Sequence, residues 1–223
     1  MYLVDDNAEY CLIISGGDYE PIPKKYKKQN ITYVIACDHG YDYSRNMHIK
    51  PNYVVGDFDS MNCDMSAVKE SGAEYRTYPS EKDDTDTMLA VKDALARGYL
   101  NIIVCCAFGG RLDHTYANIQ ACAYGAKMGA RVIALGKAEE TILIGANGST
   151  ANISICRDDD QYLSVFSITD KCEDVTITGA KYNTERVTLT NTFPIGISNE
   201  FSSDVVNISL TKGIMMIISS GER

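Results

Sequence analysis

The chain has 223 residues, a length that allows one large domain or two modest ones. Hydrophobic residues make up 45% and charged residues 23%, which is typical of a folded globular protein and excludes a disordered or fibrous chain. The formal net charge of −9 disfavours nucleic acid and anionic membranes as partners, because binding to either requires a basic surface.

The cysteines indicate the compartment. There are eight, with no C-x-x-C pair and several within apolar runs, so we expect free, buried thiols in a reducing cytosol; disulfides are the alternative. The N-terminal residues lack the basic start and long apolar region of a signal peptide. No apolar run reaches the roughly 20 residues that cross a bilayer. The sequence therefore predicts a cytoplasmic protein.

Short apolar runs of β type alternate with helical stretches from residue 10 to about residue 136. This alternation is typical of βαβ units and predicts a mostly parallel sheet flanked by helices. The runs are YCLIIS (10–15), TYVIAC (32–37), NYVVG (52–56), AEYRTY (73–78), NIIVCCA (101–107) and RVIAL (131–135).

Two of the intervening stretches have apolar residues at helical spacing. In the first, the apolar face is expected to consist of Met88, Val91 and Leu95, and the acids and threonines that precede it suit helix capping. In the second, the spacing of four, three, four and three residues predicts one apolar helix face. That face comprises Leu112, Tyr116, Ile119, Ala123 and Ala126.

After about residue 138 the pattern changes to short runs rich in Ile, Val and Thr. TILIGA and STANISI flank Asn147-Gly148, and VVNISL and IMMIIS flank Thr211-Lys212-Gly213, so the sequence predicts two β-hairpins. We expect an α/β domain at 1–137 and a second, all-β domain at 138–223. No long linker separates the two halves, which indicates close packing.

The stretch VVGDFDS (54–60) places two acids directly after an apolar run. In open parallel sheets, ligands bind beyond the carboxyl ends of the strands. If strand geometry continues through Phe58, Asp57 and Asp59 point to one side, with Cα atoms about 6.6 Å apart at a rise of roughly 3.3 Å per residue. The two carboxylates could then share one ion or two neighbouring ions. The alternative is a solvated turn in which Asp59 or Ser60 caps the next helix.

A second acidic stretch, KDDTDT (82–87), stands at a helix start. One or two acids suffice to offset the helix dipole, at about 0.3–1 kcal/mol each. Three acids in four residues, brought near the first pair, would repel by roughly 4 kcal/mol per close pair at an effective dielectric constant near 20. A cation removes that repulsion. Oxygen ligands favour Mg²⁺, which commonly uses one or two carboxylates together with substrate phosphates, so the acids predict a phosphorylated substrate.

The usual phosphate-binding loops are absent. There is no G-x-x-x-x-G-K-[ST] loop and no G-x-G-x-x-G loop, which disfavours an ordinary P-loop kinase and an ordinary Rossmann dehydrogenase. Gly16-Gly17, after the first strand, could let the backbone approach a ligand closely.

A third stretch, FGGRLDH (108–114), also follows a strand and opens a helix. A helix N-terminus attracts anions, and Arg111 can bind phosphate through two hydrogen bonds. Alone, the stretch is also compatible with a plain turn carrying a surface Arg–Asp pair. Because two acidic motifs also stand at strand ends, we interpret FGGRLDH as a phosphate-binding site. Asp38, in Cys37-Asp38-His39-Gly40, adds an acid at a fourth strand end.

Four motifs occur in an order that resembles the thiamine pyrophosphokinase family, also called thiamine diphosphokinase. They are GDFDS (56–60), KDDTDT (82–87), GGRLDH (109–114) and PIGISNEF (194–201). The resemblance implies an N-terminal α/β domain, a C-terminal β-sandwich and a homodimer, with each site between the α/β domain of one subunit and the β domain of the other. It also implies the reaction: the thiamine hydroxyl attacks the β-phosphorus of ATP, with Mg²⁺ as cofactor, to give thiamine diphosphate and AMP.

The resemblance also implies a role for each matching residue. Asp57, Asp59 and Asp86 are the acids expected to be catalytic and to hold Mg²⁺, and Asp38 belongs to the same cluster. Lys82 would neutralise phosphate charge, or it is a solvated surface lysine. The expected nucleotide-binding residues are Lys82, Asp83, Thr85, Arg111 and Asp113.

On the thiamine side, the resemblance implies that Ser198 and Asn199 supply hydrogen bonds to the pyrimidine ring; the alternative is a polar turn without a ligand. Family members often place an aromatic side chain against the cationic thiamine rings, and this chain has no Trp. Tyr182 and Phe201 are the substitutes we expect, through stacking or cation–π contact, unless they are core aromatics.

Three other functions remain open on the sequence. One is a noncatalytic protein that senses nucleotide or thiamine, and another is a metal-dependent hydrolase or transferase with a different acceptor. A purely structural interaction protein would leave four acidic or glycine-rich strand ends unexplained.

Overall fold

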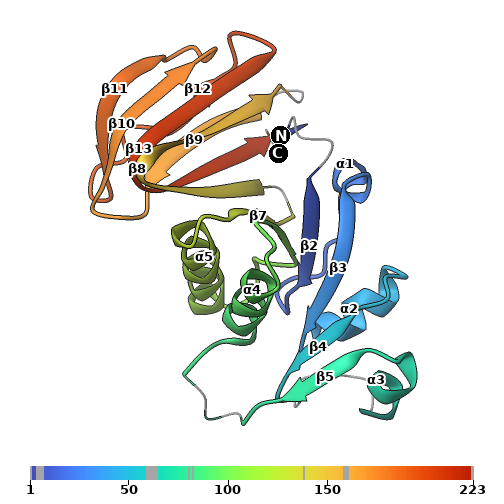
Figure 1. Cartoon of the computed structure of the whole chain (residues 1–223). Helices are drawn as coiled ribbons and strands as arrows, with labels where there is room; N and C mark the ends of the chain where they lie inside the picture. The colour runs from blue at the N-terminus through green and yellow to red at the C-terminus, as the bar shows by residue number, and fades with distance from the viewer. Residues whose placement is uncertain are drawn as a thin grey trace.

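The structure is a computed structural model that describes residues 2–3, 8–58, 65–79, 81, 83–137, 139–157 and 161–221. The first part of the chain alternates strands and helices, and the last part is β-rich (Figure 1). The helices are α1 (Lys24–Lys27), α2 (Gly40–Asn46), α3 (Met65–Ser71), α4 (Asp86–Ala96) and α5 (Leu112–Lys127). The strands are β1 (Tyr2–Leu3), β2 (Glu9–Ile14), β3 (Asn30–Cys37), β4 (Tyr53–Gly56), β5 (Glu74–Thr77), β6 (Asn101–Cys105), β7 (Arg131–Leu135), β8 (Glu139–Cys156), β9 (Gln161–Ser167), β10 (Lys171–Thr178), β11 (Thr184–Thr190), β12 (Asn199–Glu200) and β13 (Val205–Gly221).

The α/β half contains the parallel sheet that the sequence predicts. Its strands lie in the order β7-β6-β2-β3-β4-β5, and each neighbouring pair is parallel. The chain moves outward from β2 to β5 and then returns to the other side of β2 with β6. The strand order therefore reverses next to β2, and in sheets of this kind ligands bind beyond the carboxyl ends of the strands at such a switch point.

Helices cover both faces of this sheet. The α4 and α5 helices pack on one face against buried side chains such as Ile13, Ile35 and Val104. On the other face, the α2 and α3 helices pack against Ala36 and Val54. Figure 1 shows α4 and α5 together on one side of the strands, and α2 and α3 near the β4–β5 edge. The predicted mixture of a helix-flanked sheet and a β-rich C-terminal half is confirmed.

The predicted apolar helix faces are only partly right. Leu112 and Tyr116 are 82% and 62% exposed, although the spacing placed them on the buried face of α5. That helix instead buries small residues, including Ala121, Cys122 and Gly125. An ideal Cβ at Gly125 would lie 2.7 Å from a methyl carbon of Val132 on β7, so close packing, rather than the largest apolar side chains, sets this face.

The two predicted hairpins are wrong. The β8 strand runs through Asn147-Gly148 without reversing, and β13 runs through Thr211-Lys212-Gly213. The two segments instead face each other, with Asn147 opposite Lys212, at an irregularity in the antiparallel ladder between Leu210 and Lys212. Gly148 and Gly213 have φ angles of +84° and +103°, which glycine adopts without steric cost. The glycines therefore mark an irregular point within two long paired strands.

These long strands join the two halves. The β8 strand pairs with β7 through residues 140–143 and with β13 along nearly its whole length, so the described strands form one continuous hydrogen-bonded sheet. The core is also shared, because Leu12 and Ile133 of the parallel sheet belong to the same buried cluster as Ile155 and Ile217 of the β-rich half. The predicted boundary near residue 137 coincides with the start of β8 and stays a prediction.

Two further predictions concern the environment of the chain. The seven cysteines within the described residues are all free, and six of them are buried; Cys63 lies outside the described residues. Among the helices of the described part of the chain, none is long and apolar enough to cross a membrane.

Candidate active site

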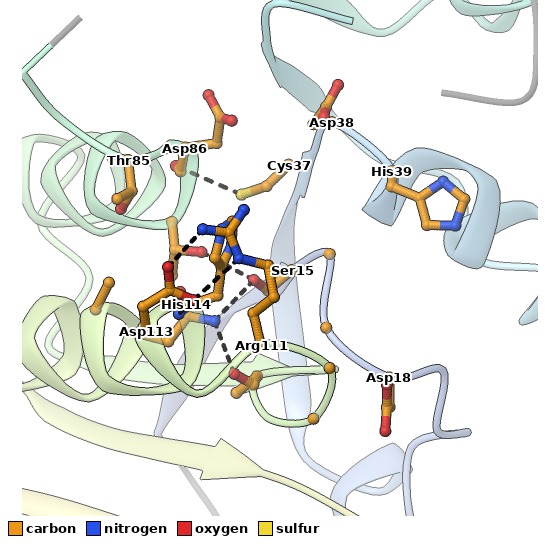
Figure 2. A pocket seen from close by; sticks show the side chains of 18 of the residues that line it. Ser15, Asp18, Cys37, Asp38, His39, Thr85, Asp86, Arg111, Asp113 and His114 are labelled. Atoms are coloured by element: carbon orange, nitrogen blue, oxygen red, sulfur yellow. Dashed lines mark hydrogen bonds and ion pairs between the residues drawn. The ribbon is translucent and has the colours of Figure 1, made fainter. Parts of the chain in front are cut away.

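An open cleft of about 890 Å³ lies at the carboxyl ends of the parallel strands, at the switch point beside β2. Its walls come from the segments that follow β2, β3, β4 and β6 and from the first turns of α4 and α5. Figure 2 shows Asp18, Asp38, Asp86, Arg111 and Asp113 around this cleft. The motifs that are distant in the sequence thus meet in one place.

Most of the predicted site residues that the structure describes line this cleft. They are Asp38, Asp57, Asp83, Thr85, Asp86, Arg111 and Asp113. Asp59, Ser60 and Lys82 lie outside the described residues, and Ser198 and Asn199 are not among the residues that line the cleft. The described lining contains seven aspartates and one arginine, so the cleft carries strong negative charge. A polyanionic substrate enters such a cleft only with cations that offset this charge.

The backbone turns sharply where β3 and β4 end. Asp38 and Phe58 have φ angles of +48° and +64°. The predicted continuation of strand geometry through Phe58 is therefore wrong, because β4 ends at Gly56 and the chain bends two residues later. The Asp38 N–H donates to the Val55 carbonyl at 2.9 Å, and an ideal Cβ at Gly56 would lie 3.0 Å from Cβ of Asp38. The missing side chain at Gly56 brings the two acidic strand ends close together.

The start of α4 places the second acidic motif. Thr85 is the N-cap residue, and its Oγ1 accepts a hydrogen bond from the Met88 N–H at 3.2 Å, as the predicted capping requires. The two carboxylate oxygens of Asp84 lie 2.8 and 2.7 Å from Nζ of Lys92, one of several contacts that fix this turn. Asp86 is half-buried, and its backbone carbonyl accepts a hydrogen bond from the Cys37 thiol at 3.6 Å.

The third motif begins α5 and carries an exposed ion pair. Nε of Arg111 lies 3.1 Å from Oδ1 of Asp113, and both side chains are largely exposed. The hydrogen bond from Arg111 lowers the pKa of the Asp113 carboxyl, and the same bond raises the pKa of the guanidinium. Because exposed ion pairs are weak, a bound phosphate can compete with Asp113 for the guanidinium.

The loops after β2 and β6 run side by side along the cleft. The Gly17 N–H donates to the Cys106 carbonyl at 2.9 Å, and the Asp18 N–H donates to the Phe108 carbonyl at 2.8 Å. An ideal Cβ at Gly17 would lie 2.5 Å from the Phe108 carbonyl oxygen, so the close approach that Gly17 permits is to this neighbouring loop. The Tyr43 hydroxyl donates to the Gly17 carbonyl at 2.9 Å and holds the loop from the α2 side.

Three buried polar side chains at the cleft were missed by the sequence analysis. The hydroxyls of Ser15 and Thr87 are 2.8 Å apart, and Nδ2 of Asn118 donates to the Ala107 carbonyl at 2.7 Å and lies 3.5 Å from Oγ of Ser15. All three side chains are buried and line the cleft. The signal available was that Thr87 is the last residue of the KDDTDT motif, and that Asn118 lies in the second turn of the helix that the GGRLDH motif opens.

The residues expected to face thiamine lie in the β-rich half. The side-chain amide of Asn199 accepts from the Tyr182 N–H at 2.9 Å, donates to the Tyr182 carbonyl at 2.8 Å, and accepts from the Glu200 N–H at 3.0 Å. The Tyr182 side chain is 63% exposed, whereas Phe201 packs against the core. Of the two predicted substitutes for Trp, only Tyr182 is presented to solvent, and Asn199 fixes its backbone.

The same region has an exposed apolar segment. Phe193, Ile195 and Ile197 are each at least 60% exposed, and they directly precede Ser198. Ser198 has a φ angle of +56°, and its N–H donates to Oγ of Ser164 at 3.0 Å. The apolar segment directly precedes Ser198 and Asn199 in the sequence, and Asn199 in turn hydrogen-bonds the backbone of the exposed Tyr182.

The donor chemistry of the cleft fits a hard divalent cation. Among the described residues, no three His, Cys, Asp or Glu side chains are grouped closely enough to hold a metal ion unaided. The aspartates nevertheless offer only oxygen donors, and Mg²⁺ is commonly bound by one or two carboxylates while substrate phosphates complete its coordination. A site of that kind needs no preformed group of three.

Comparison with known proteins agrees with this arrangement. The family described as "Thiamin pyrophosphokinase, catalytic domain" matches residues 24–134, and "Thiamin pyrophosphokinase, vitamin B1 binding domain" matches residues 150–215. A protein of Bacillus subtilis (strain 168) named thiamine pyrophosphokinase is 28% identical over 212 residues, which cover 93% of this chain and 97% of that protein.

Solved structures give the same result. A crystal structure of thiamine pyrophosphokinase from Bacillus subtilis superposes with a TM-score of 0.81 at 25% identity, over 96% of this chain and 100% of that one. Thiamin pyrophosphokinase from Candida albicans has a TM-score of 0.75 at 16% identity, over 96% and 89%, and shows a common fold. The chain is therefore an enzyme that belongs to the thiamin pyrophosphokinase family.

Proposed function

We propose that this enzyme transfers a diphosphate group from Mg²⁺-bound ATP to the hydroxyl of thiamine, producing thiamine diphosphate and AMP. The observation that carries the proposal is the cleft of about 890 Å³, in which acids from three strand or helix ends meet a glycine-rich, arginine-bearing loop. Such transfers depend mainly on positioning and on neutralising phosphate charge, and both kinds of group are present in the cleft.

The acids are proposed to hold the metal. Asp57 and Asp86 line the cleft together with Asp38. Asp59, which shares the GDFDS motif with Asp57, lies outside the described residues. When bound, Mg²⁺ would neutralise and orient the phosphate oxygens. Asp38, Asp57 and Asp86 are half-buried in the cleft, and their carboxylate oxygens are the donors that Mg²⁺ commonly uses.

The nucleotide-side residues have separate proposed tasks. Thr85 already accepts from the Met88 N–H, so its hydroxyl proton can donate to a phosphate oxygen. Arg111 would exchange its exposed partner Asp113 for phosphate, with the N-terminus of α5 favouring the same negative charge. Asp83 is exposed at the rim of the cleft. Lys82 keeps its proposed role of neutralising phosphate charge.

Thiamine is proposed to bind between two copies of the chain. Tyr182, Ser198 and Asn199 do not line the cleft of their own chain, which supports a thiamine site completed by the β-rich half of a second subunit. The exposed Phe193 and Ile195 suit burial in that homodimer, because contiguous apolar surface is typical of interfaces. With its free thiols, the enzyme is proposed to act in the cytoplasm.

The direct test is to incubate the purified protein with ATP, Mg²⁺ and thiamine, with and without EDTA, and to follow thiamine diphosphate and AMP by chromatography. We expect both products in equal amounts and only with free Mg²⁺. In Asp57→Asn, turnover should fall by at least about 100-fold, because a transition-state charge contact is worth several kcal/mol. The matched control is Asp204→Asn, an exposed acid in the β-rich half, which should keep wild-type turnover.

Two results would contradict the proposal. If ATP binds but no thiamine diphosphate forms, the acceptor is wrong, and a sensing protein or a transferase with another acceptor becomes the better interpretation. If Asp57→Asn retains full, Mg²⁺-dependent turnover, the assignment of the metal ligands is wrong.

A further inference from the structure

Below the acids and the glycine-rich loop, three polar side chains are buried where a core would ordinarily place apolar ones. Ser15, Thr87 and Asn118 are 3%, 5% and 8% exposed. Their contacts form a chain: Asn118 Nδ2 lies 3.5 Å from Ser15 Oγ, which lies 2.8 Å from Thr87 Oγ1. Burying polar groups is costly unless they are hydrogen-bonded, so the bonds between these side chains favour one arrangement of the three.

Each member of this set is attached to a different functional segment. Ser15 directly precedes Gly16-Gly17, and Thr87 directly follows Asp86 in the first turn of α4. Asn118, from the second turn of α5, donates to the carbonyl of Ala107 at 2.7 Å, just before the loop that contains Arg111. The set therefore joins the start of α4, which carries Asp86 and is the proposed metal-facing segment, to the loops after β2 and β6, which are the two proposed phosphate-facing loops.

The backbone links these segments unequally. The two phosphate-facing loops are already tied together, because the Ser15 N–H donates to the Cys105 carbonyl at 3.0 Å and further bonds follow along the loops. The start of α4 is tied to them through the Ser15–Thr87 hydrogen bond, and to β3 through the weaker contact of the Cys37 thiol with the Asp86 carbonyl at 3.6 Å. Loss of the Thr87 hydroxyl should thus loosen the start of α4 relative to the two loops while leaving the loops joined to each other.

We propose that Ser15, Thr87 and Asn118 form a positioning network that holds the metal-facing acids in register with the phosphate-facing loops. The network couples the binding of Mg²⁺ to the binding of ATP, since both must meet at the same phosphate oxygens. The inference rests on the proposed function, because it takes Mg²⁺ and ATP as the ligands of this cleft.

The test is calorimetric titration of ATP into the full chain, with Mg²⁺ and with EDTA. The measured quantity is the factor by which Mg²⁺ tightens ATP binding. We expect this factor to fall by about three- to tenfold in Ser15→Ala and in Thr87→Val, the usual equilibrium effect of losing one buried hydrogen bond. ATP affinity in EDTA should change less than about twofold, because the two loops stay joined.

Three further variants separate positioning from stability. Thr87→Ser keeps the hydroxyl and should retain the wild-type factor. The double variant Ser15→Ala/Thr87→Val should lose no more than Ser15→Ala alone, because Ser15→Ala already removes the bond that Thr87→Val removes. Ser167→Ala removes a buried hydroxyl that donates to the Thr169 carbonyl at 2.6 Å in the β-rich half. It should lower stability without changing the factor.

The outcomes distinguish this inference from the proposed function. If the factor is unchanged in Ser15→Ala and Thr87→Val, or falls equally in Ser167→Ala, the positioning network is wrong even if the wild type makes thiamine diphosphate. If the wild type makes none but shows a factor that depends on the Thr87 hydroxyl, the network stands and the acceptor assignment fails. If Mg²⁺ does not tighten ATP binding in the wild type, the positioning network is wrong, whether or not thiamine diphosphate is formed.

Discussion

Replacing Asn199 by Ala tests whether this residue fixes the Tyr182 segment or contacts substrate directly. The Asn199 side chain is 7% exposed and makes three hydrogen bonds to the backbone of Tyr182 and Glu200. Each bond contributes about 1 kcal/mol net, and buried partners left without bonds cost about 1–3 kcal/mol more. We therefore expect Asn199→Ala to lower the free energy of unfolding by about 3 kcal/mol.

Thermal unfolding followed by circular dichroism measures this loss. For a chain of this size, 1 kcal/mol shifts Tm by about 2–4 °C, so the Tm of Asn199→Ala should fall by about 6–12 °C. The matched control is Asn207→Ala, an exposed residue of β13 that accepts one hydrogen bond from Ser154. Its Tm should fall by less than about 2 °C, because exposed substitutions usually change stability by under 0.5 kcal/mol.

Steady-state kinetics of the same variants show what the segment does. With Tyr182 less firmly held, the KM for thiamine should rise in Asn199→Ala while the KM for ATP stays constant. A Tm drop no larger than that of Asn207→Ala would refute the reasoning from hydrogen bonds. If that small drop came with a steep rise in the KM for thiamine, Asn199 would be a direct substrate contact, as the sequence resemblance implies.

Three other measurements check the account of charge, burial and assembly. Burial raises the pKa of Cys11 and Cys122 from 9.0 to about 12, so these thiols lose their protons at lower pH in the unfolded chain than in the folded one. The free energy of unfolding should therefore fall as the pH rises from 9 to 12. An unchanged urea midpoint at about pH 8 and about pH 10 would contradict this. In Arg111→Ala, the pKa of Asp113 should rise toward its ordinary value, which a carboxyl NMR titration would show; no change would mean that the ion pair is absent in solution. Phe193→Asp should shift sedimentation from dimer toward monomer, and a wild type that is monomeric and fully active when dilute would exclude a shared site.

The parallel sheet could be predicted because its signal is repeated and local. Buried parallel strands read as short apolar runs, and each of the runs expected between residues 10 and 135 overlaps a strand of the structure. The end of β3 is an example, since TYVIAC (32–37) contributes four fully or nearly fully buried residues before the acid at Asp38. The position of such a strand can therefore be predicted from its own hydrophobic run and the polar turns around it, without knowing which strands it pairs with.

The hairpins could not be predicted correctly because a glycine signal is ambiguous. Asn147-Gly148 has the composition of a two-residue turn, yet each side of it is long enough to remain paired with β13. A glycine with a left-handed φ angle serves a bulge as well as a turn. Only the residue that pairs with Asn147 distinguishes a bulge from a turn. That residue is Lys212, which lies within the second glycine-containing segment, Thr211-Lys212-Gly213.

The site was predictable to the extent that charge density signals it. Aspartates at several strand ends are costly to bring together, so they indicated a shared cation site, and the structure places Asp38, Asp57 and Asp86 along one cleft. Ser15, Thr87 and Asn118 gave no comparable signal. A lone serine, threonine or asparagine is common in any sequence, and its burial depends on three-dimensional contacts between segments up to 103 positions apart.

Part of the backbone strain in the described residues lies at strand ends beside the cleft, and the rest lies at His48, Asp174, Arg186 and Ser198. Left-handed φ angles at residues other than glycine cost roughly 1–2 kcal/mol each, and three of them, at Asp38, Phe58 and Cys106, follow the ends of β3, β4 and β6. Glycine would relieve that strain at every one of these positions. At Asp38, however, glycine would also remove a carboxylate from the cleft. Under the proposed metal role, Asp38 combines the bend and the charge in one residue, whereas at the neighbouring Gly56 the missing side chain makes room for Asp38.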